Sequence, residues 1–222
     1  MTYCDVISST EKNEWLGAIK EELKRMDEGK VFDIVDLRYA LSIVPHESIL
    51  STKWVFVKKP ENYKARLVAR GFKQIHGINY EETFAPTPTF NALRLLFSTA
   101  LLKEWPIKIF DVKVAFLHSV IDKPVFLWCP QGMNIPKFKV LALRKALYWM
   151  KQVSWCWWLH FKEILSLISF QSNNKDPSTY TFMKEADVSI LWIHVYDGEI
   201  TALLKELMGE ITHEIIKKLC EP

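Results

Sequence analysis

Apolar side chains recur every three to four positions in two segments of the chain, as they do on one side of an amphipathic helix. The first segment covers residues 11 to 28, with Ser9 or Thr10 as the expected cap and Gly29 as the expected end. The second begins at Thr89, which we expect to cap it, and ends before Pro106. The side chains expected on its buried face are Leu93, Leu96, Phe97 and Leu101.

Two further helices are predicted in the C-terminal half of the chain. Residues 154 to 170 are apolar on nearly all sides, which indicates a buried helix. Residues 200 to 219 have helical periodicity again, with an expected interruption at Gly209.

Alternating, β-branched and aromatic stretches predict strands between these helices. Residues 53 to 72 predict a hairpin around a Pro-Glu-Asn turn, whereas residues 41 to 50 are expected to form a loop. The remaining expected strands cover residues 31 to 37, 107 to 117 and 188 to 196, with one more after a turn at 176 to 180. Strands separated by helices indicate an α+β chain with a sheet at its centre.

The chain has 222 residues, of which 49% are hydrophobic, and a formal net charge of +3. This length is enough for one large domain or two small ones, and so small a charge gives no global argument for nucleic-acid binding. Basic residues are instead concentrated in the segment from Lys53 to Lys73, which contains several cations and one acid, Glu61. These cations are Lys53, Lys58, Lys59, Lys64, Arg66, Arg70 and Lys73.

The four cysteines, Cys4, Cys129, Cys156 and Cys220, form no Cys-x-x-Cys pair. The sequence therefore predicts neither a zinc site nor a disulfide framework, and we interpret them as reduced thiols of an intracellular protein. No apolar run approaches the roughly 20 residues that a membrane helix needs, so no membrane partner is expected.

Two carboxylates stand in strand-like surroundings. Asp111 lies within residues 107 to 117, where an unpaired ionised carboxylate would be unfavourable unless a cation or donors compensated it. The local alternation leaves open whether Asp111 is a solvent-facing strand acid or a functional one. Asp197 ends the apolar run ILWIHVYD and precedes Gly198, a pattern that typically delivers an acid to a site.

Seven blocks in the sequence resemble the reverse transcriptase domain of copia-type retrotransposons, in the family's order and at close to its spacing. The blocks are KWVF, YKARLVARGF, GINYEETFAP, FDVKVAFL, ALYWMKQ, DPSTY and HVYD. Together the resemblance extends from about Trp15 to about Leu219, and collinear blocks are a stronger signal than any single one. It implies a right-hand polymerase whose fingers and palm contain a central antiparallel sheet.

In such polymerases two Mg²⁺ ions lie between palm carboxylates and nucleotide phosphates, one activating the primer 3′ hydroxyl and one stabilising the leaving pyrophosphate. The resemblance assigns catalysis and metal binding to Asp111 and Asp197, which we expect on neighbouring antiparallel strands with Tyr196 beside them. It also implies an RNA or DNA template-primer and a deoxynucleoside triphosphate (dNTP) as partners. The oligomeric state stays open.

Four more residues match nucleotide-binding positions of the family. Lys64 and Arg66 match the cations of the fingers, which can neutralise a triphosphate, and we expect them to line the same cleft as the carboxylates. Phe116 matches the aromatic residue that excludes a 2′ hydroxyl, and Gln152 matches a glutamine placed against the incoming nucleotide. Without the resemblance, the cations would be a solvated hairpin face, Phe116 a core aromatic, and Gln152 uninformative.

The chain departs from the family's pattern at the metal site. Where the family has Tyr-x-Asp-Asp, this chain has His194, Val195, Tyr196 and Asp197, so Tyr196 replaces the first aspartate ligand. A phenol is neutral at pH 7 and is a poor ligand for Mg²⁺. The metal site is therefore expected to be incomplete and to bind Mg²⁺ weakly.

Other departures affect the nucleotide side and the C-terminus. Trp149 stands in place of a glycine, and Ser154 and Trp155 stand in place of a proline and an arginine. The sequence ends at Pro222, before the position at which the thumb and the ribonuclease H domain are expected.

The expected organisation is an N-terminal helical extension over residues 1 to 50, fingers and palm over 51 to 200, and a helical tail over 201 to 222 in which the thumb is absent. Three functions compete: an active polymerase, a noncatalytic nucleic-acid-binding module that uses the basic hairpin at 53 to 73, and a degenerate polymerase copy. We favour the degenerate polymerase, because loss of a principal metal ligand lowers the rate of such enzymes by many powers of ten.

Overall fold

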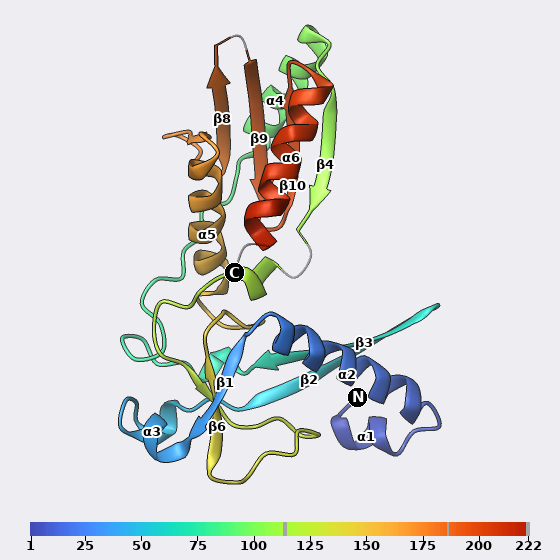
Figure 1. The fold of residues 1–222 in the computed structure, drawn as a ribbon, viewed down its shortest axis with the longest axis vertical. Helices are drawn as coiled ribbons and strands as arrows, with labels where there is room; N and C mark the ends of the chain where they lie inside the picture. Colours follow the sequence, from blue (N-terminus) through green and yellow to red (C-terminus); the bar gives the residue numbers. More distant parts are fainter. Residues whose placement is uncertain (113–114, 186, 221–222) are drawn as a thin grey trace. The chain divides into compact units, whose positions relative to one another are not determined.

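The computed structural model describes residues 1–112, 115–185 and 187–220, and the chain divides into two compact units (Figure 1). Unit 1 comprises residues 1–83 and 116–156, and unit 2 comprises residues 84–115 and 157–222. Each unit combines helices with antiparallel sheets, which confirms a mixed α and β composition. The described strands fall into three separate sheets, and the five-stranded sheet has the most strands of the three.

Unit 1 contains two of these sheets, with strand orders β1-β6-β5 and β2-β3. Its helices are α1 (Tyr3–Ile7), α2 (Lys12–Glu28) and α3 (Leu37–Leu41), with short 3₁₀ helices at His46–Ser48 and Gly71–Lys73. Its strands are β1 (Phe32–Asp36), β2 (Thr52–Lys59), β3 (Asn62–Ala69), β5 (Phe126–Leu127) and β6 (Lys139–Leu143). Another 3₁₀ helix spans Ala115–His118. The segment predicted as a loop thus contains the end of α3 and a 3₁₀ turn.

Helix α2 packs across the β2–β3 hairpin, as its apolar periodicity predicts (Figure 1). Trp15 is fully buried and meets the rings of Tyr63 and Phe56 edge to face, with centroid distances of 4.6 and 5.4 Å. Gly29 follows the last helical residue as expected. The expected cap was wrong, because α2 begins at Lys12 and the residue before it is Glu11, which makes no side-chain capping bond.

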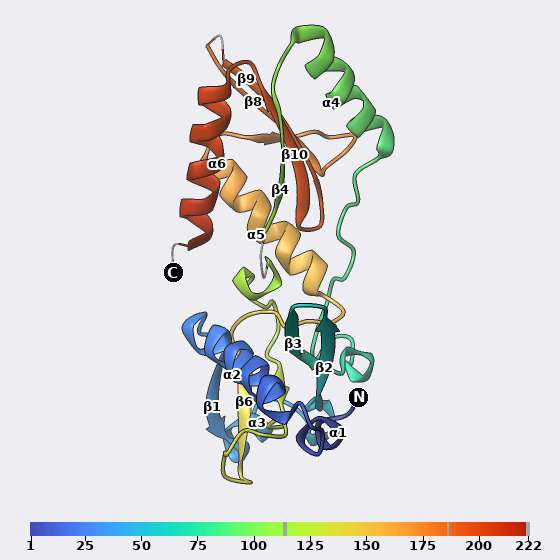
Figure 2. The same cartoon turned by 90° about the vertical axis from the view of Figure 1, so that its right-hand side faces the viewer.

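Unit 2 contains a five-stranded antiparallel sheet with the order β4-β10-β9-β8-β7. Its strands are β4 (Ile107–Asp111), β7 (Gln171–Ser172), β8 (Thr179–Lys184), β9 (Asp187–His194) and β10 (Asp197–Ala202). Its helices are α4 (Phe90–Lys103), α6 (Lys205–Cys220) and most of α5 (Val153–Leu167). Figure 2 shows α4 on one face of this sheet and α5 and α6 on the other.

Helix α4 begins at the predicted cap, because the Thr89 hydroxyl accepts a hydrogen bond from the Ala92 N–H at 3.2 Å. Its expected buried face was only partly correct. Leu96 and Ala100 are buried, but Leu101 is 80% exposed and Phe97 is 39% exposed. The helix contacts the sheet through a narrow stripe of residues four apart, so the wider apolar face remains in solvent.

Three other predictions for the C-terminal half need correction. The strand expected over 107 to 117 ends at Asp111, and residues 113 and 114 of that prediction lie outside the described residues. Residues 200 to 202 belong to β10, and α6 passes through Gly209 without a break because its apolar face packs on both sides of it. Helix α5 is not buried all round, since Leu167 is 67% exposed.

Candidate functional site

Asp111 and Asp197 lie directly opposite each other on adjacent antiparallel strands of unit 2. Asp111 is the last residue of β4 and Asp197 the first of β10, and the strand register pairs them. Cβ atoms of such cross-strand partners lie about 5 Å apart, so both carboxylates leave the same face of the sheet at nearly the same point. The expected neighbouring-strand arrangement is therefore confirmed, whereas the assignment of a catalytic role stays a prediction.

Asp111 affects the protonation of Asp197. Partial desolvation at the sheet surface, a hydrogen bond with Asp111 and repulsion by its charge all raise the pKa of Asp197, while His194 lowers it. His194 is the register partner of Asp197 on β9, so a histidine and two aspartates cross three adjacent strands. A cation placed between the aspartates would relieve their repulsion.

A two-residue turn holds this arrangement in place. Val195 and Tyr196 connect β9 to β10, and the Tyr196 carbonyl accepts a hydrogen bond from the Val112 N–H at 2.9 Å. Val195 has φ 59°, an unfavourable left-handed conformation for a β-branched residue. Its carbonyl accepts the indole N–H of Trp157 at 2.5 Å, which fixes the turn to α5. Tyr196 thus follows a constrained residue and is itself 41% exposed beside the aspartates.

Glu199 is a third acid on this face that the sequence interpretation did not select. Strand alternation places it two residues after Asp197, on the same side of β10. Its Oε2 atom is buried without a hydrogen-bond partner in the described part of the chain, and burial followed by repulsion from Asp197 raises its pKa. The period-two spacing of Asp-Gly-Glu within a predicted strand is the signal that could have revealed it.

The donor chemistry of this face suits a hard divalent cation, but the number of converging ligands is small. Asp111 and Asp197 supply carboxylate oxygens, which such cations prefer. Within residues 1–112, 115–185 and 187–220, however, no group of three or more His, Cys, Asp or Glu side chains is arranged to hold a metal ion. The fit to a polymerase metal site is therefore incomplete, and Tyr196 occupies the position at which the resemblance implies another carboxylate.

The β2–β3 hairpin of unit 1 has one face against α2 and one basic face. The register and alternation of the strands place eight residues on the second face, and none of these eight is acidic. They are Lys53, Val55, Val57, Lys59, Asn62, Lys64, Arg66 and Val68. Lys64 and Arg66 are exposed, as the alternation predicted, and Arg70 is exposed just beyond the end of β3. We call these eight residues the basic outer face.

Aromatic residues adjoin this face at Arg66. The Arg66 guanidinium lies over the Tyr148 ring, 5.6 Å from its centroid, and Tyr148 meets Phe116 edge to face at 6.0 Å. Two residues selected from the sequence, Arg66 and Phe116, therefore both contact Tyr148, which was not selected. Cations beside aromatic rings can hold a phosphate and stack on a base.

Gln152 occupies a different environment from the other candidates. It is fully buried, its Oε1 accepts from Gln74 at 2.8 Å, and its Nε2 donates to the Asn79 carbonyl at 2.8 Å. A further bond joins Nε2 to Asp122 at 3.4 Å. This arrangement favours a structural role in unit 1, and contact with a nucleotide stays a prediction.

The DPSTY segment fastens α4 to the sheet of unit 2. The Asp176 carboxylate accepts hydrogen bonds from the backbone N–H and the hydroxyl of Thr89, both at 2.9 Å. Ser178 then donates its hydroxyl to the Pro86 carbonyl at 2.9 Å. This block of the sequence is therefore explained by structural contacts.

Comparison with known proteins identifies the family. A family model described as reverse transcriptase (RNA-dependent DNA polymerase) matches residues 30–219. The chain therefore belongs to this reverse transcriptase family, and it is a reverse transcriptase domain of the kind found in copia-type retrotransposon Pol polyproteins. Reverse transcriptases of this family act on nucleic acid with nucleotides and use divalent metal ions.

Relatives with this domain come from plants and yeast. The retrovirus-related Pol polyprotein from transposon TNT 1-94 of Nicotiana tabacum is 29% identical over 94% of this chain and 16% of its own length. That from transposon RE1 of Arabidopsis thaliana is 30% identical over 87% of the chain and 14% of its own length. The Ty1-ER2 Gag-Pol polyprotein of Saccharomyces cerevisiae is 28% identical over 70% of the chain and 9% of its own length.

The chain thus spans about one sixth or less of these polyproteins. Among the described residues, no helix has the length and apolar character needed to cross a membrane. The described cysteine side chains, Cys4, Cys129 and Cys156, are free.

Proposed function

We propose that the chain is a degenerate reverse transcriptase domain whose metal site lacks one carboxylate. The supporting observation is the direct register pairing of Asp111 with Asp197, with Tyr196 in the turn beside them. In this proposal the two aspartates bind Mg²⁺ weakly through carboxylate oxygens and waters. Bound Mg²⁺ would supply charge stabilisation for nucleotidyl transfer, and polymerase activity is correspondingly low.

The same proposal assigns parts of a right-hand polymerase to the two units. The five-stranded sheet of unit 2 corresponds to the palm, and the β2–β3 hairpin of unit 1 to the fingers. Lys64 and Arg66 would neutralise phosphates of a dNTP or template-primer, and Phe116 would limit the space beside the sugar. Gln152 would act indirectly, by holding the 74–80 segment through its buried amide.

A second function, noncatalytic nucleic-acid binding, has its own support in the basic outer face. That face carries Lys53, Lys59, Lys64 and Arg66 without an acid. Phosphate contacts of this kind need no metal, so binding would persist where polymerisation does not. Arg66 beside Tyr148 adds a stacking position for a base.

The binding proposal is tested by the salt dependence of oligonucleotide affinity. We expect Lys64→Ala combined with Arg66→Ala to reduce the slope of log affinity against log salt by up to about two units, because each lost phosphate contact contributes about 0.7 to 0.9. Lys12→Ala, which removes an exposed cation of α2, is the matched control and should leave the slope unchanged. Equal slopes in all three proteins would reject the basic outer face as the binding surface.

Primer extension on a labelled RNA or DNA template tests the catalytic proposal. We expect the unmodified chain to give no detectable extension with Mg²⁺ and dNTPs. Robust extension would reject the degenerate assignment, because it would require an effective metal site without the missing carboxylate.

A further inference from the structure

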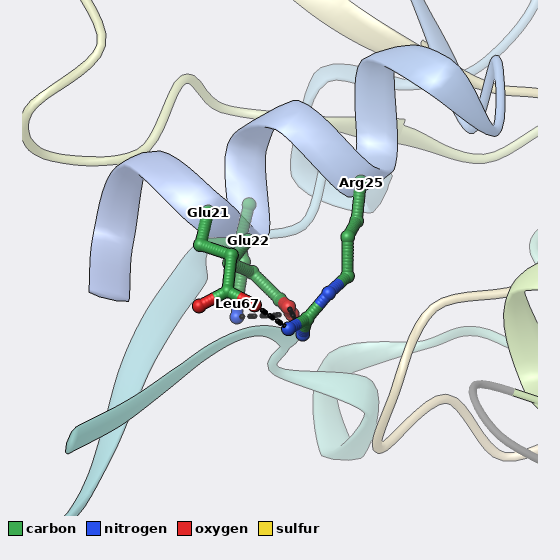
Figure 3. Close-up of polar contacts among 4 residues, drawn as sticks. All are labelled: Glu21, Glu22, Arg25 and Leu67. Atoms are coloured by element: carbon green, nitrogen blue, oxygen red, sulfur yellow. Dashed lines mark hydrogen bonds and ion pairs between the residues drawn. The ribbon is translucent and has the colours of Figure 1, made fainter. Parts of the chain in front are cut away.

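The outer edge of β3 is held by side-chain and backbone groups from two other segments of unit 1. In a two-stranded hairpin, alternate N–H groups of each strand point away from the partner strand and need other acceptors. The Leu67 N–H donates to Glu22 Oε1 of α2 at 3.4 Å, as Figure 3 shows. The Ala69 N–H donates to the Tyr148 carbonyl at 3.1 Å. These two bonds are two residues apart on the same edge.

Glu22 is an unusual residue to find at this position, because it is only 2% exposed. Its Oε2 lies 3.4 Å from the Arg25 guanidinium, which also contacts the exposed Glu21 (Figure 3). Burial raises the pKa of Glu22, against the opposing effects of the Leu67 N–H, Arg25 and Arg66. An apolar residue would avoid the cost of desolvating a carboxylate here. We therefore attribute the presence of Glu22 to the hydrogen bond that its carboxylate accepts from the Leu67 N–H.

The hydrogen bonds to the Leu67 and Ala69 N–H groups both influence the position of Arg66. Leu67, held by Glu22, is the next residue along β3, and its side chain faces α2 while that of Arg66 faces the opposite side. Tyr148 accepts from Ala69 through its carbonyl and lies under the Arg66 guanidinium with its ring. A shift of β3 along or away from this edge would therefore move Arg66 off the Tyr148 ring.

We propose that Glu22 is a positioning residue for the basic outer face. Its carboxylate holds the backbone of β3 at Leu67, and it thereby keeps Arg66 over Tyr148 in the orientation that receives a phosphate. The required property is a hydrogen-bond acceptor at this point of the edge. This inference rests on the proposed nucleic-acid binding by the hairpin, and it adds a residue from a separate helix that contacts no nucleic acid.

The test measures affinity for a labelled single-stranded oligonucleotide across a salt series, with folding checked by thermal melting. Glu22→Met keeps the volume of the side chain but removes the acceptor, and Glu22→Gln keeps an acceptor oxygen. We expect Glu22→Met to lower the salt slope by about one unit, which is the contribution of one phosphate contact. Glu22→Gln should have the same slope as the unmodified chain. Glu21→Ala, which removes the neighbouring exposed acid that pairs with Arg25, is the matched control and should leave the slope unchanged.

A double-mutant cycle with Arg66→Ala separates positioning from a general loss of structure. If Glu22 acts through Arg66, Glu22→Met should cause no further loss of slope in the Arg66→Ala background. Additive losses, or a Glu22→Met protein that binds like the unmodified chain while Arg66→Ala weakens binding, would overturn the inference alone. An Arg66→Ala protein with unchanged binding would also overturn the inference, whereas an unchanged slope in the Lys64→Ala, Arg66→Ala double variant would overturn the proposed binding surface itself.

Discussion

At position 149 the backbone has a conformation that tryptophan tolerates poorly. Trp149 has φ 69°, in the left-handed region where a Cβ atom is unfavourable and glycine is not. The backbone is tightly packed at this point, since a Cβ on Gly71 would lie only 2.0 Å from the Trp149 carbonyl oxygen. The resemblance places glycine at residue 149, so the tryptophan introduces local strain at the segment that carries Tyr148.

Replacing Trp149 by glycine and by alanine separates this strain from the packing of the indole ring. Both variants lose the same ring, but only glycine adopts positive φ without a steric cost. We expect Trp149→Gly to exceed Trp149→Ala in free energy of unfolding by about 1 kcal/mol, measured by chemical denaturation.

The matched control for this comparison is Lys20, an exposed residue within α2. There alanine should be more stable than glycine by about 1 kcal/mol, because the helix favours alanine. The same order at residues 20 and 149 would show that the left-handed backbone at residue 149 stores no such strain.

At the scale of elements, α2 and β3 are joined by a buried carboxylate whose protonation is linked to folding. Burial raises the pKa of Glu22, so the folded state favours the protonated form more than the unfolded chain does. The stability that protonation of Glu22 contributes is fully present at a pH below the ordinary glutamate pKa of 4.5, and it is lost as pH rises through the raised pKa. The charged groups that act on Glu22 are Glu21 and Arg25 of α2, and Arg66 on the far face of β3.

We therefore expect Glu22→Gln to change the pH dependence of stability in a defined direction. Glutamine stays neutral, so the variant should gain in free energy of unfolding relative to the unmodified chain as pH rises from about 4.5 to neutrality. Denaturation curves over this pH range provide the measurement, with Glu21→Gln as the exposed control. A relative loss of stability with rising pH would mean that Arg25 and Arg66 outweigh the burial of the carboxylate.

Elements with a strong local signal were predictable from the sequence. The hairpin at 52–69 follows from two alternating segments around a short turn, and such a turn also sets the register. Thr89 was predictable as a cap because its hydroxyl acts on a neighbouring N–H. Strand β6 and the exposure of Leu101 were not, because the first depends on pairing with the distant β1 and the second on the width of a tertiary contact.

At the scale of the whole molecule, the sequence predicted the family and the paired aspartates but not the division into two units. Unit 1 joins residues 1–83 to 116–156, so its boundaries depend on contacts between segments far apart in the chain. The burial of Gln152 was equally hidden, because its partners Gln74 and Asn79 precede it by more than 70 residues. Local patterns identify single side chains, whereas such networks appear only in the folded chain.

The central claim is that Tyr196 leaves the site of Asp111 and Asp197 one carboxylate short. The most direct measurement compares the melting temperatures of the unmodified chain, Tyr196→Asp and the neutral control Tyr196→Asn with and without Mg²⁺. At a Mg²⁺ concentration of ten times the dissociation constant, a restored site should raise the free energy of unfolding by about 1.4 kcal/mol. This gain corresponds to a rise in melting temperature on the order of 3 °C. We predict this rise in Tyr196→Asp alone, and its loss when Asp111→Asn is added. An equal response to Mg²⁺ in all of these proteins would contradict the account.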